Sequence, residues 1–313
     1  MIEVCKRIKS QTLREQICRR EFLTTASAMV IGGSWTASQI LTGCTTNTSN
    51  NLGKIGIQLY TLRNEIEKDI SGTLRRLAEV GFAGVETAFW PEGMKVKDAA
   101  KLLNDAGLAV CSSHCEIPVG EKKSQMLEIA EAFQCSKMIW HGWPEDERYK
   151  TLDGIKLLAE IYNESNHFAK SNGLQFGIHN HWWEFKNMID GRFAYEVLLD
   201  YLEKDVFFEI DTYWVKVAGH DPAEIVAKFG RRAPCLHIKD GPARWTESIA
   251  TDPEPMVAVG SGTQNFPAVV KAANGYTEWM IVEMDNVATD VFSAIHESYR
   301  YLTENKLVQL PGT

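Results

Sequence analysis

Residues 206–211 read VFFEID, and this stretch decides the fold. It is short, it is apolar at both alternating sets of positions apart from Glu209, and it ends in Asp211. Strands of a parallel sheet that is covered on both sides have this pattern. Asp221 and Pro222 come next and supply an N-cap and a first-turn proline for a helix. The stretch therefore predicts one β-strand followed by one α-helix, the unit of a parallel α/β fold.

The same unit recurs along the chain from Lys54 onward. Apolar residues at helical spacing lead up to Gly81, Gly107, Gly173 and Gly275, and each glycine suits the left-handed end of a helix. The strand candidates are residues 55–60, 84–89, 108–113, 137–141, 174–179, 206–211, 234–238 and 279–283. Eight strands that alternate with helices over about 250 residues favour a (β/α)₈ TIM barrel over an open doubly wound sheet. We expect the barrel at residues 54–306 and a short tail at 307–313.

The composition excludes several classes of protein. With 44% hydrophobic and 24% charged residues, the 313-residue chain resembles an ordinary globular protein. Its formal net charge of −8 argues against a nucleic-acid partner, because a negative surface repels phosphate backbones. Neither G-x-G-x-x-G nor G-x-x-x-x-G-K followed by Ser or Thr comes after a strand candidate. Dinucleotide and P-loop nucleotide binding therefore lose their main support.

The first 44 residues are typical of an export signal. The sequence RREFL at 19–23 follows a basic start, a mildly apolar run covers 25–40, and LTGC stands at 41–44. RREFL resembles a twin-arginine signal, and LTGC resembles the lipobox of bacterial lipoproteins. We therefore expect a signal peptide at 1–43, a lipid on Cys44, a flexible tether at 44–53, and a periplasmic protein that meets the membrane only through its lipid. A buried first helix with an incidental cysteine is the alternative.

Four cysteines belong to the predicted barrel, namely Cys111, Cys115, Cys135 and Cys235. They form no C-x-x-C pair, and each lies in an apolar stretch. This placement favours buried free thiols over a zinc site. A disulfide in an oxidising compartment stays open, because sequence alone cannot pair the four residues.

Polar residues gather where the predicted strands end, which is where the active sites of TIM barrels lie. In chain order these residues are Gln58, Glu86, His114, His141, His179, Asp211, His237 and Glu283. The last four are two imidazoles and two carboxylates, a set that suits a transition metal better than Ca²⁺. We therefore predict that His179, Asp211, His237 and Glu283 bind one divalent ion, Mn²⁺, Zn²⁺, Co²⁺, Fe²⁺ or Mg²⁺. Structural hydrogen bonding or helix capping is the alternative for each residue taken singly.

Two further residues share parity with these ligands and should point into the barrel. Glu209 precedes Asp211 by two positions, and either hydrogen-bonds a ligand or pairs with a Lys or Arg. Lys239 follows His237 by two positions, and either holds a sugar oxygen or forms a structural ion pair. Aromatic residues cluster in the loops just after these strands: Trp143, Trp182, Trp183, Tyr213 and Trp214. Their flat faces predict a carbohydrate pocket.

These segments resemble the sugar isomerase/epimerase superfamily with the xylose-isomerase-like barrel, over most of residues 54–306. The motifs that carry the resemblance are GIHNHWWEF at 177–185, EIDTYW at 209–214, AGHDP at 218–222, HIKD at 237–240, VGSG at 259–262 and IVEMD at 281–285. The resemblance implies metal-ligand positions for Asp211, His237 and Glu283. It also implies that Glu283 is a catalytic carboxylate.

In the ketose 3-epimerase branch of that superfamily, the fifth strand ends in a second glutamate that binds metal and moves a proton. His179 stands at this position here, which keeps a metal ligand but removes one carboxylate. Candidates to move the proton instead are His181, Glu184 and Lys239. Glu184 and Arg244 also fall near positions that hold substrate hydroxyls in that branch. The remaining candidate substrate-binding residues are Glu86, His114, Trp183 and Trp214.

A divalent ion that chelates a sugar carbonyl and its neighbouring hydroxyl acidifies the C–H bond between them and stabilises an enediolate. Returning the proton isomerises or epimerises the sugar. We therefore predict a metal-dependent isomerase or epimerase of a ketose or related unphosphorylated sugar, because no phosphate-binding loop is evident. The alternatives are a lyase or dehydratase of a keto-sugar, keto-glycoside or keto-inositol, and a sugar-binding lipoprotein without activity. The sequence leaves the oligomeric state open, a homodimer included.

Overall fold

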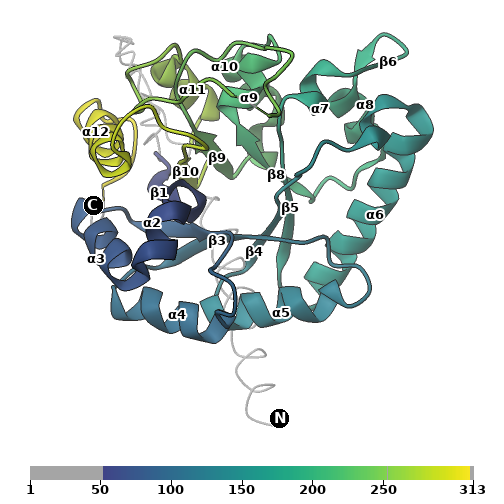
Figure 1. Cartoon of the computed structure of the whole chain (residues 1–313). Coiled ribbons are helices and arrows are strands. Elements are labelled where there is room, and N and C mark those ends of the chain that lie inside the picture. The colour runs from purple at the N-terminus through teal and green to yellow at the C-terminus, as the bar shows by residue number, and fades with distance from the viewer. Residues whose placement is uncertain (1–51, 252, 311–313) are drawn as a thin grey trace, which may run out of the picture. The chain divides into compact units, whose positions relative to one another are not determined.

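The computed structural model describes residues 52–251 and 253–310. Within them, eight parallel strands close into a barrel in the order β1-β10-β9-β8-β5-β4-β3-β2, and helices surround it (Figure 1). The predicted (β/α)₈ TIM barrel is therefore confirmed. The predicted signal peptide at 1–43, Cys44 and the tether up to residue 51 lie outside the described residues.

The barrel strands match the eight predicted ones to within two residues at either end. They are β1 (Lys54–Gln58), β2 (Gly84–Thr87), β3 (Val110–Cys115), β4 (Lys137–Trp140), β5 (Gln175–His179), β8 (Phe207–Asp211), β9 (Cys235–Ile238) and β10 (Trp279–Val282). A small antiparallel hairpin, β6 (Met188–Ile189) and β7 (Arg192–Phe193), forms a separate sheet. The sequence analysis did not predict this hairpin.

The helices are α2 (Arg63–Lys68), α3 (Ile70–Val80), α4 (Val96–Asp105), α5 (Lys122–Phe133), α6 (Leu152–Ser171), α7 (Trp183–Lys186), α8 (Ala194–Tyr201), α9 (Thr212–Val217), α10 (Pro222–Phe229), α11 (Phe266–Ala273) and α12 (Val291–Glu304). Three short 3₁₀ helices are η1 (Leu59–Leu62), η2 (Glu147–Lys150) and η3 (Gly230–Arg232). The Asp221 carboxylate accepts the Ala223 N–H and caps α10 as predicted, and Gly81 ends α3 with φ 102°. In the described part of the chain, no helix combines the length and apolar character that crossing a membrane requires.

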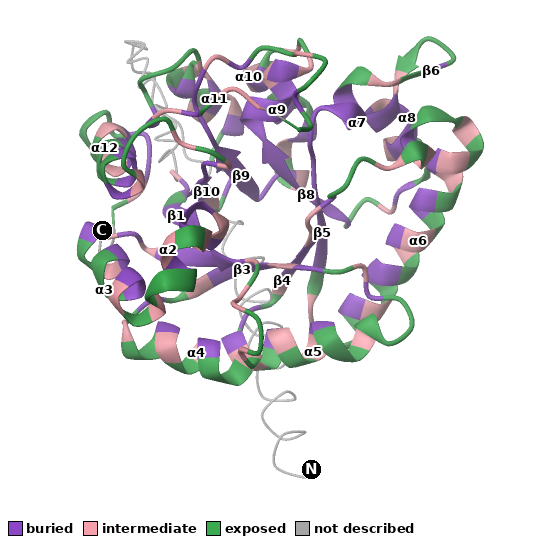
Figure 2. Cartoon of the chain, viewed as in Figure 1, coloured by how far each residue is buried: buried purple, intermediate pink, exposed green. Residues whose placement is uncertain are grey.

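The inner faces of strands and helices are buried, and the outer faces of the helices are exposed (Figure 2). Inside the barrel, Cys111, Cys235 and Ile281 form a small apolar cluster of their own. His237, two residues after Cys235 on β9, and Glu283, two residues after Ile281, are polar although also buried. The barrel interior therefore changes from apolar to polar toward the carboxyl ends of its strands. All four cysteines of the barrel are buried free thiols, as predicted.

Candidate active site

A cavity of about 390 Å³ opens at the carboxyl ends of the barrel strands. Its aromatic lining residues are Tyr60, Phe89, Trp143, Trp182 and Trp214. Its polar lining residues include His114, His141, His179, His181, Lys239 and Glu283. Of the five predicted pocket aromatics, Trp143, Trp182 and Trp214 line the cavity, whereas Trp183 and Tyr213 do not. Flat apolar surfaces beside hydrogen-bonding groups suit a carbohydrate ring.

Asp211, His237 and Glu283, which we call the outer group, lie together at the carboxyl ends of the strands; Glu283 lines the cavity, whereas Asp211 and His237 are fully buried and do not. Each offers one ligand atom, and these atoms lie within 4.8 Å of one another. His237 Nδ1 is 2.6 Å from Glu283 Oε2 and 4.0 Å from Asp211 Oδ2. These three atoms are buried, and Lys239 Nζ lies within 3.0 Å of both carboxylate oxygens. Three buried N and O ligand atoms that converge in this way fit a divalent metal ion.

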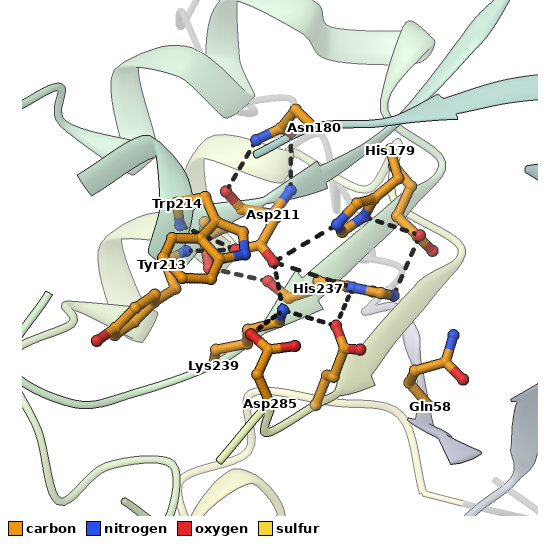
Figure 3. A network of polar contacts seen from close by, with 12 residues as sticks. Gln58, His179, Asn180, Asp211, Tyr213, Trp214, His237, Lys239 and Asp285 are labelled. Atoms are coloured by element: carbon orange, nitrogen blue, oxygen red, sulfur yellow. Dashed lines mark hydrogen bonds and ion pairs between the residues drawn. The ribbon is translucent and has the colours of Figure 1, made fainter. Parts of the chain in front are cut away.

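Asp211 is held by the way strand β8 turns into helix α9. Its Oδ1 accepts hydrogen bonds from the backbone N–H groups of Tyr213 and Trp214, at 2.9 Å each, and so caps the helix. The Asn180 side chain fixes the Asp211 backbone, accepting its N–H at 3.0 Å and donating to its carbonyl at 3.4 Å. These bonds leave Oδ2 to face His237 (Figure 3).

His179 lies beside the outer group at the end of strand β5, with Nε2 3.9 Å from Asp211 Oδ2. The structure therefore brings Asp211, His237 and Glu283 together, whereas His179 is near Asp211 but groups with His114, Glu209 and His237. Burial lowers the pKa of His179 well below its usual value, so its ring is neutral, as a metal ligand must be. Burial also acts to lower the pKa of His237. The negative charges of Glu209, Glu283 and Glu86 have a larger effect in the opposite direction, so the pKa of His237 is raised well above its usual value. His237 would have to lose its Nδ1 proton to hold a metal ion there.

The Lys239 ammonium lies among three carboxylates (Figure 3). Its Nζ is 3.0 Å from Asp211 Oδ2, 2.8 Å from Glu283 Oε2 and 2.9 Å from Asp285 Oδ2. Burial disfavours its charge, but these carboxylates raise the pKa of Lys239 well above its usual value. Burial acts to raise the pKa of Glu283, but Lys239 and His237 hold it well below the usual value. Both side chains are therefore charged at neutral pH.

Glu86, Glu209 and His114 form a second polar set, which we call the inner group. Glu209 Oε2 is 2.8 Å from His114 Nε2, 3.2 Å from His179 Nδ1 and 3.1 Å from His237 Nε2. Glu86 Oε1 is 2.7 Å from His237 Nε2 and 3.2 Å from His114 Nε2. His237 therefore contacts the outer group with one ring nitrogen and the inner group with the other. Glu86, which the sequence analysis assigned to substrate binding, is fully buried beneath the cavity.

Three other predicted substrate-binding residues are not among those that line the cavity. Glu184 is buried, and its Oε2 accepts the backbone N–H of His181 at 3.0 Å. Trp183 stacks on the far side of the cavity lining, with its ring 4.4 Å from that of His181 and at 9° to it. The Arg244 side chain is 71% exposed and pairs with Glu254. The other predicted contacts, His114, Trp214, His181 and Lys239, do line the cavity.

The sequence analysis assigned no role to Arg63 and Asp285, which also line the cavity. The Arg63 guanidinium donates to the Asp285 backbone carbonyl at 2.5 Å and to the Tyr60 carbonyl at 2.9 Å. Asp285 follows Glu283 by two residues, and this spacing could have indicated that both side chains point to the same side of the chain. Arg63 begins helix α2 just after η1, where no motif marks it.

The family model of the xylose isomerase-like TIM barrel matches residues 74–304 of the chain. The protein belongs to this family. The resemblance drawn from the sequence motifs is thereby confirmed. No curated protein matches this chain in sequence.

Solved structures resemble this xylose isomerase-like barrel over most of its length. A sugar phosphate isomerase/epimerase from Parabacteroides distasonis is 26% identical, with a TM-score of 0.67, and the match covers 84% of this chain and 98% of that one. A D-allulose 3-epimerase from Methylomonas sp. is 14% identical, with a TM-score of 0.60, covering 81% and 98%. A probable 3-DHS dehydratase from Bacillus anthracis is 13% identical, with a TM-score of 0.61, covering 80% and 98%. The two more distant likenesses show the fold alone.

Proposed function

We propose that this protein is a divalent-metal-dependent isomerase or epimerase of an unphosphorylated ketose or related sugar. The observation that carries the proposal is the outer group, whose three buried ligand atoms lie within 4.8 Å of one another beside an aromatic-walled cavity that Glu283 lines. The likeness to a sugar phosphate isomerase/epimerase supports the reaction class. Asp211, His237 and Glu283 would hold the ion, with His179 as the fourth ligand.

The bound ion would polarise the sugar carbonyl and its neighbouring hydroxyl, which makes the C–H bond between them acidic. Glu283 faces the cavity as an ionised carboxylate, so it is the group placed to accept that proton. The Lys239 ammonium lies 2.8 Å from Glu283 Oε2 and can stabilise negative charge on a sugar oxygen. Trp143, Trp182 and Trp214 offer apolar faces to the sugar ring and exclude water from it.

The test is exchange of a sugar C–H with solvent deuterium. Protein loaded with Mn²⁺, Co²⁺ or Zn²⁺ is incubated with a panel of ketoses in D₂O, and the sugars are followed by NMR. We expect metal-dependent exchange and a rearranged sugar. Glu283→Gln should slow the exchange by about 10²–10⁴-fold, because the amide has no useful basicity.

Three outcomes would contradict this proposal. Wild-type exchange rates in metal-saturated Glu283→Gln would show that another group, such as His181, Glu184 or Lys239, takes the proton. An unsaturated product with a lost substituent would make the protein a lyase or dehydratase. Binding of ketoses without any exchange would make it a sugar-binding protein without activity.

We also propose that the protein is exported and anchored by a lipid on Cys44. The order of RREFL at 19–23, the apolar run at 25–40 and LTGC at 41–44 supports this proposal. Mass spectrometry of protein purified from the membrane fraction should find Cys44 as a lipidated first residue. Intact residues 1–43, or an unmodified Cys44, would contradict it.

A further inference from the structure

Two imidazoles join the inner group to the outer group. His237 directs Nδ1 toward Glu283 and Asp211, and directs Nε2 toward Glu209 and Glu86. His179 directs Nε2 toward Asp211 and Nδ1 toward Glu209. Each ring therefore has one nitrogen on either side. Glu209 is the carboxylate that contacts both rings.

The chemistry of the contacts decides where the ring protons lie. An ionised carboxylate only accepts hydrogen bonds, so an imidazole nitrogen at hydrogen-bond distance from it must carry the hydrogen. Glu209 Oε2 is hydrogen-bonded to His179 Nδ1 at 3.2 Å and lies 3.1 Å from His237 Nε2, whose hydrogen-bond partner is Glu86 Oε1 at 2.7 Å. With N–H groups at these two positions, the opposite nitrogen of each ring has its lone pair free for a metal.

We propose that Glu209 is a positioning residue that holds His179 as the Nδ1–H tautomer and, together with Glu86, holds His237 as the Nε2–H tautomer, so that both rings offer a lone pair to one metal ion. Glu209 is thereby the carboxylate that acts on both ligands. This inference rests on the metal site of the proposed function. It assigns Glu209 no contact with substrate, since Glu209 is fully buried and is not among the residues that line the cavity.

The other role that the sequence left open for Glu209 was pairing with a Lys or Arg. Within the described residues, every ion pair of Glu209 is with an imidazole: His114, His179 or His237. Glu86 is a useful comparison, because it contacts His237 but has no contact with His179 among these pairs. If these carboxylates control the tautomers of the ligands, substitution of Glu209 should disturb both His179 and His237, and substitution of Glu86 should disturb only His237.

A direct test needs no substitution of the carboxylates. The chain has eight histidines, and the Zn²⁺-loaded protein labelled with ¹⁵N-histidine reports the tautomer of each ring by NMR. Couplings within each ring and contacts with neighbouring residues assign the signals of His179 and His237 in the unsubstituted protein. We expect an Nδ1–H on His179 and an Nε2–H on His237. The opposite tautomer on either ring, or an inner nitrogen without hydrogen because a second ion binds in the inner group, would overturn the proposal.

Metal affinity gives a second readout that does not depend on activity. Glu209→Gln should weaken Zn²⁺ or Mn²⁺ binding by about 10–100-fold, as loss of a ligand's hydrogen-bond partner usually does. Glu86→Gln should weaken it less. Cys235→Ala is the matched control, because Cys235 is buried opposite Glu209 in the register of β8 and β9, and it should leave the affinity unchanged.

The outcomes separate this inference from the proposed function. If the wild-type protein binds no divalent ion, the metal site itself fails. If the wild-type protein binds an ion, and folded Glu209→Gln binds it equally tightly, only the role of Glu209 fails. If Glu209→Gln does not fold, the NMR experiment on the unsubstituted carboxylate still decides the question.

Discussion

His237 belongs to the outer group and contacts the inner group, and the two groups differ in what neutralises their carboxylates. In the inner group, imidazole nitrogens meet carboxylate oxygens at 2.7–3.2 Å, although each carboxylate keeps one oxygen without a partner in the described part of the chain. In the outer group, Asp211 Oδ2 and Glu283 Oε2 face the Lys239 ammonium at 3.0 and 2.8 Å, and Glu283 Oε2 also lies 2.6 Å from His237 Nδ1. Burying charged groups in a protein interior costs several kcal/mol unless opposite charges or a ligand compensate them. Buried charge is thus common to both groups, and the outer group differs because Glu283 reaches the cavity and Lys239 supplies a positive charge beside it.

The largest effect should come from removing an outer ligand. Asp211→Ala or His237→Ala should abolish stoichiometric divalent-metal binding, because each removes one of three atoms that converge within 4.8 Å. Elemental analysis after dialysis measures the metal, and circular dichroism checks that the fold is retained. Full metal occupancy in both folded variants would show that the outer group is not the metal site.

Lys239 distinguishes the outer group from the inner group further, because its ammonium places a positive charge beside the outer carboxylates. Lys239→Met should have two effects of opposite sign. Metal affinity should rise by about tenfold, since a competing cation 3.0 Å from Asp211 and 2.8 Å from Glu283 is gone. Turnover should fall by about 10²–10³-fold, as for loss of a group that stabilises developing negative charge.

Calorimetric titration with Mn²⁺ and deuterium exchange of a substrate ketose measure these two effects separately. Weaker metal binding in the folded Lys239→Met variant would mean that Lys239 supports the ligands rather than competing with the ion. Unchanged turnover at saturating metal would remove Lys239 from the reaction.

The sequence predicted the fold well because the fold depends on local patterns. Short apolar runs followed by helical spacing are visible within windows of about 10–20 residues. The same holds for outer ligands such as Asp211 and His237, because they stand at the ends of predicted strands. Parity alone also placed Lys239 toward the barrel interior.

The inner group was harder to predict, because its contacts join distant parts of the chain. Glu86 and His237 are 151 positions apart, and no local pattern relates them. Arg244 lies in the irregular stretch after β9, where a shift of a few residues moves a side chain from the cavity to the surface. The position of Glu184 could not be predicted because it depends on the four-residue helix α7. This helix begins at Trp183 and directs the Glu184 carboxylate to the backbone N–H of His181 rather than to the cavity.

Glu184 gives the smallest effect and shows what a buried carboxylate does outside both groups. It has no ion pair among the described residues, and burial raises its pKa to about 8 from 4.5. The native protein therefore keeps this proton up to about pH 8, whereas the unfolded chain releases it near pH 4.5. Because the native state binds more protons over this range, this contribution to stability is present at low pH and is lost as pH rises through 8.

Glu184→Gln cannot ionise, so its free energy of unfolding relative to wild type should increase by about 2 kcal/mol between pH 6 and pH 8. Urea denaturation of both proteins at the two pH values measures this difference, and other titrating groups cancel in the comparison. A difference that is the same at both pH values would mean that Glu184 is ionised in the folded protein, like the carboxylate of Glu283.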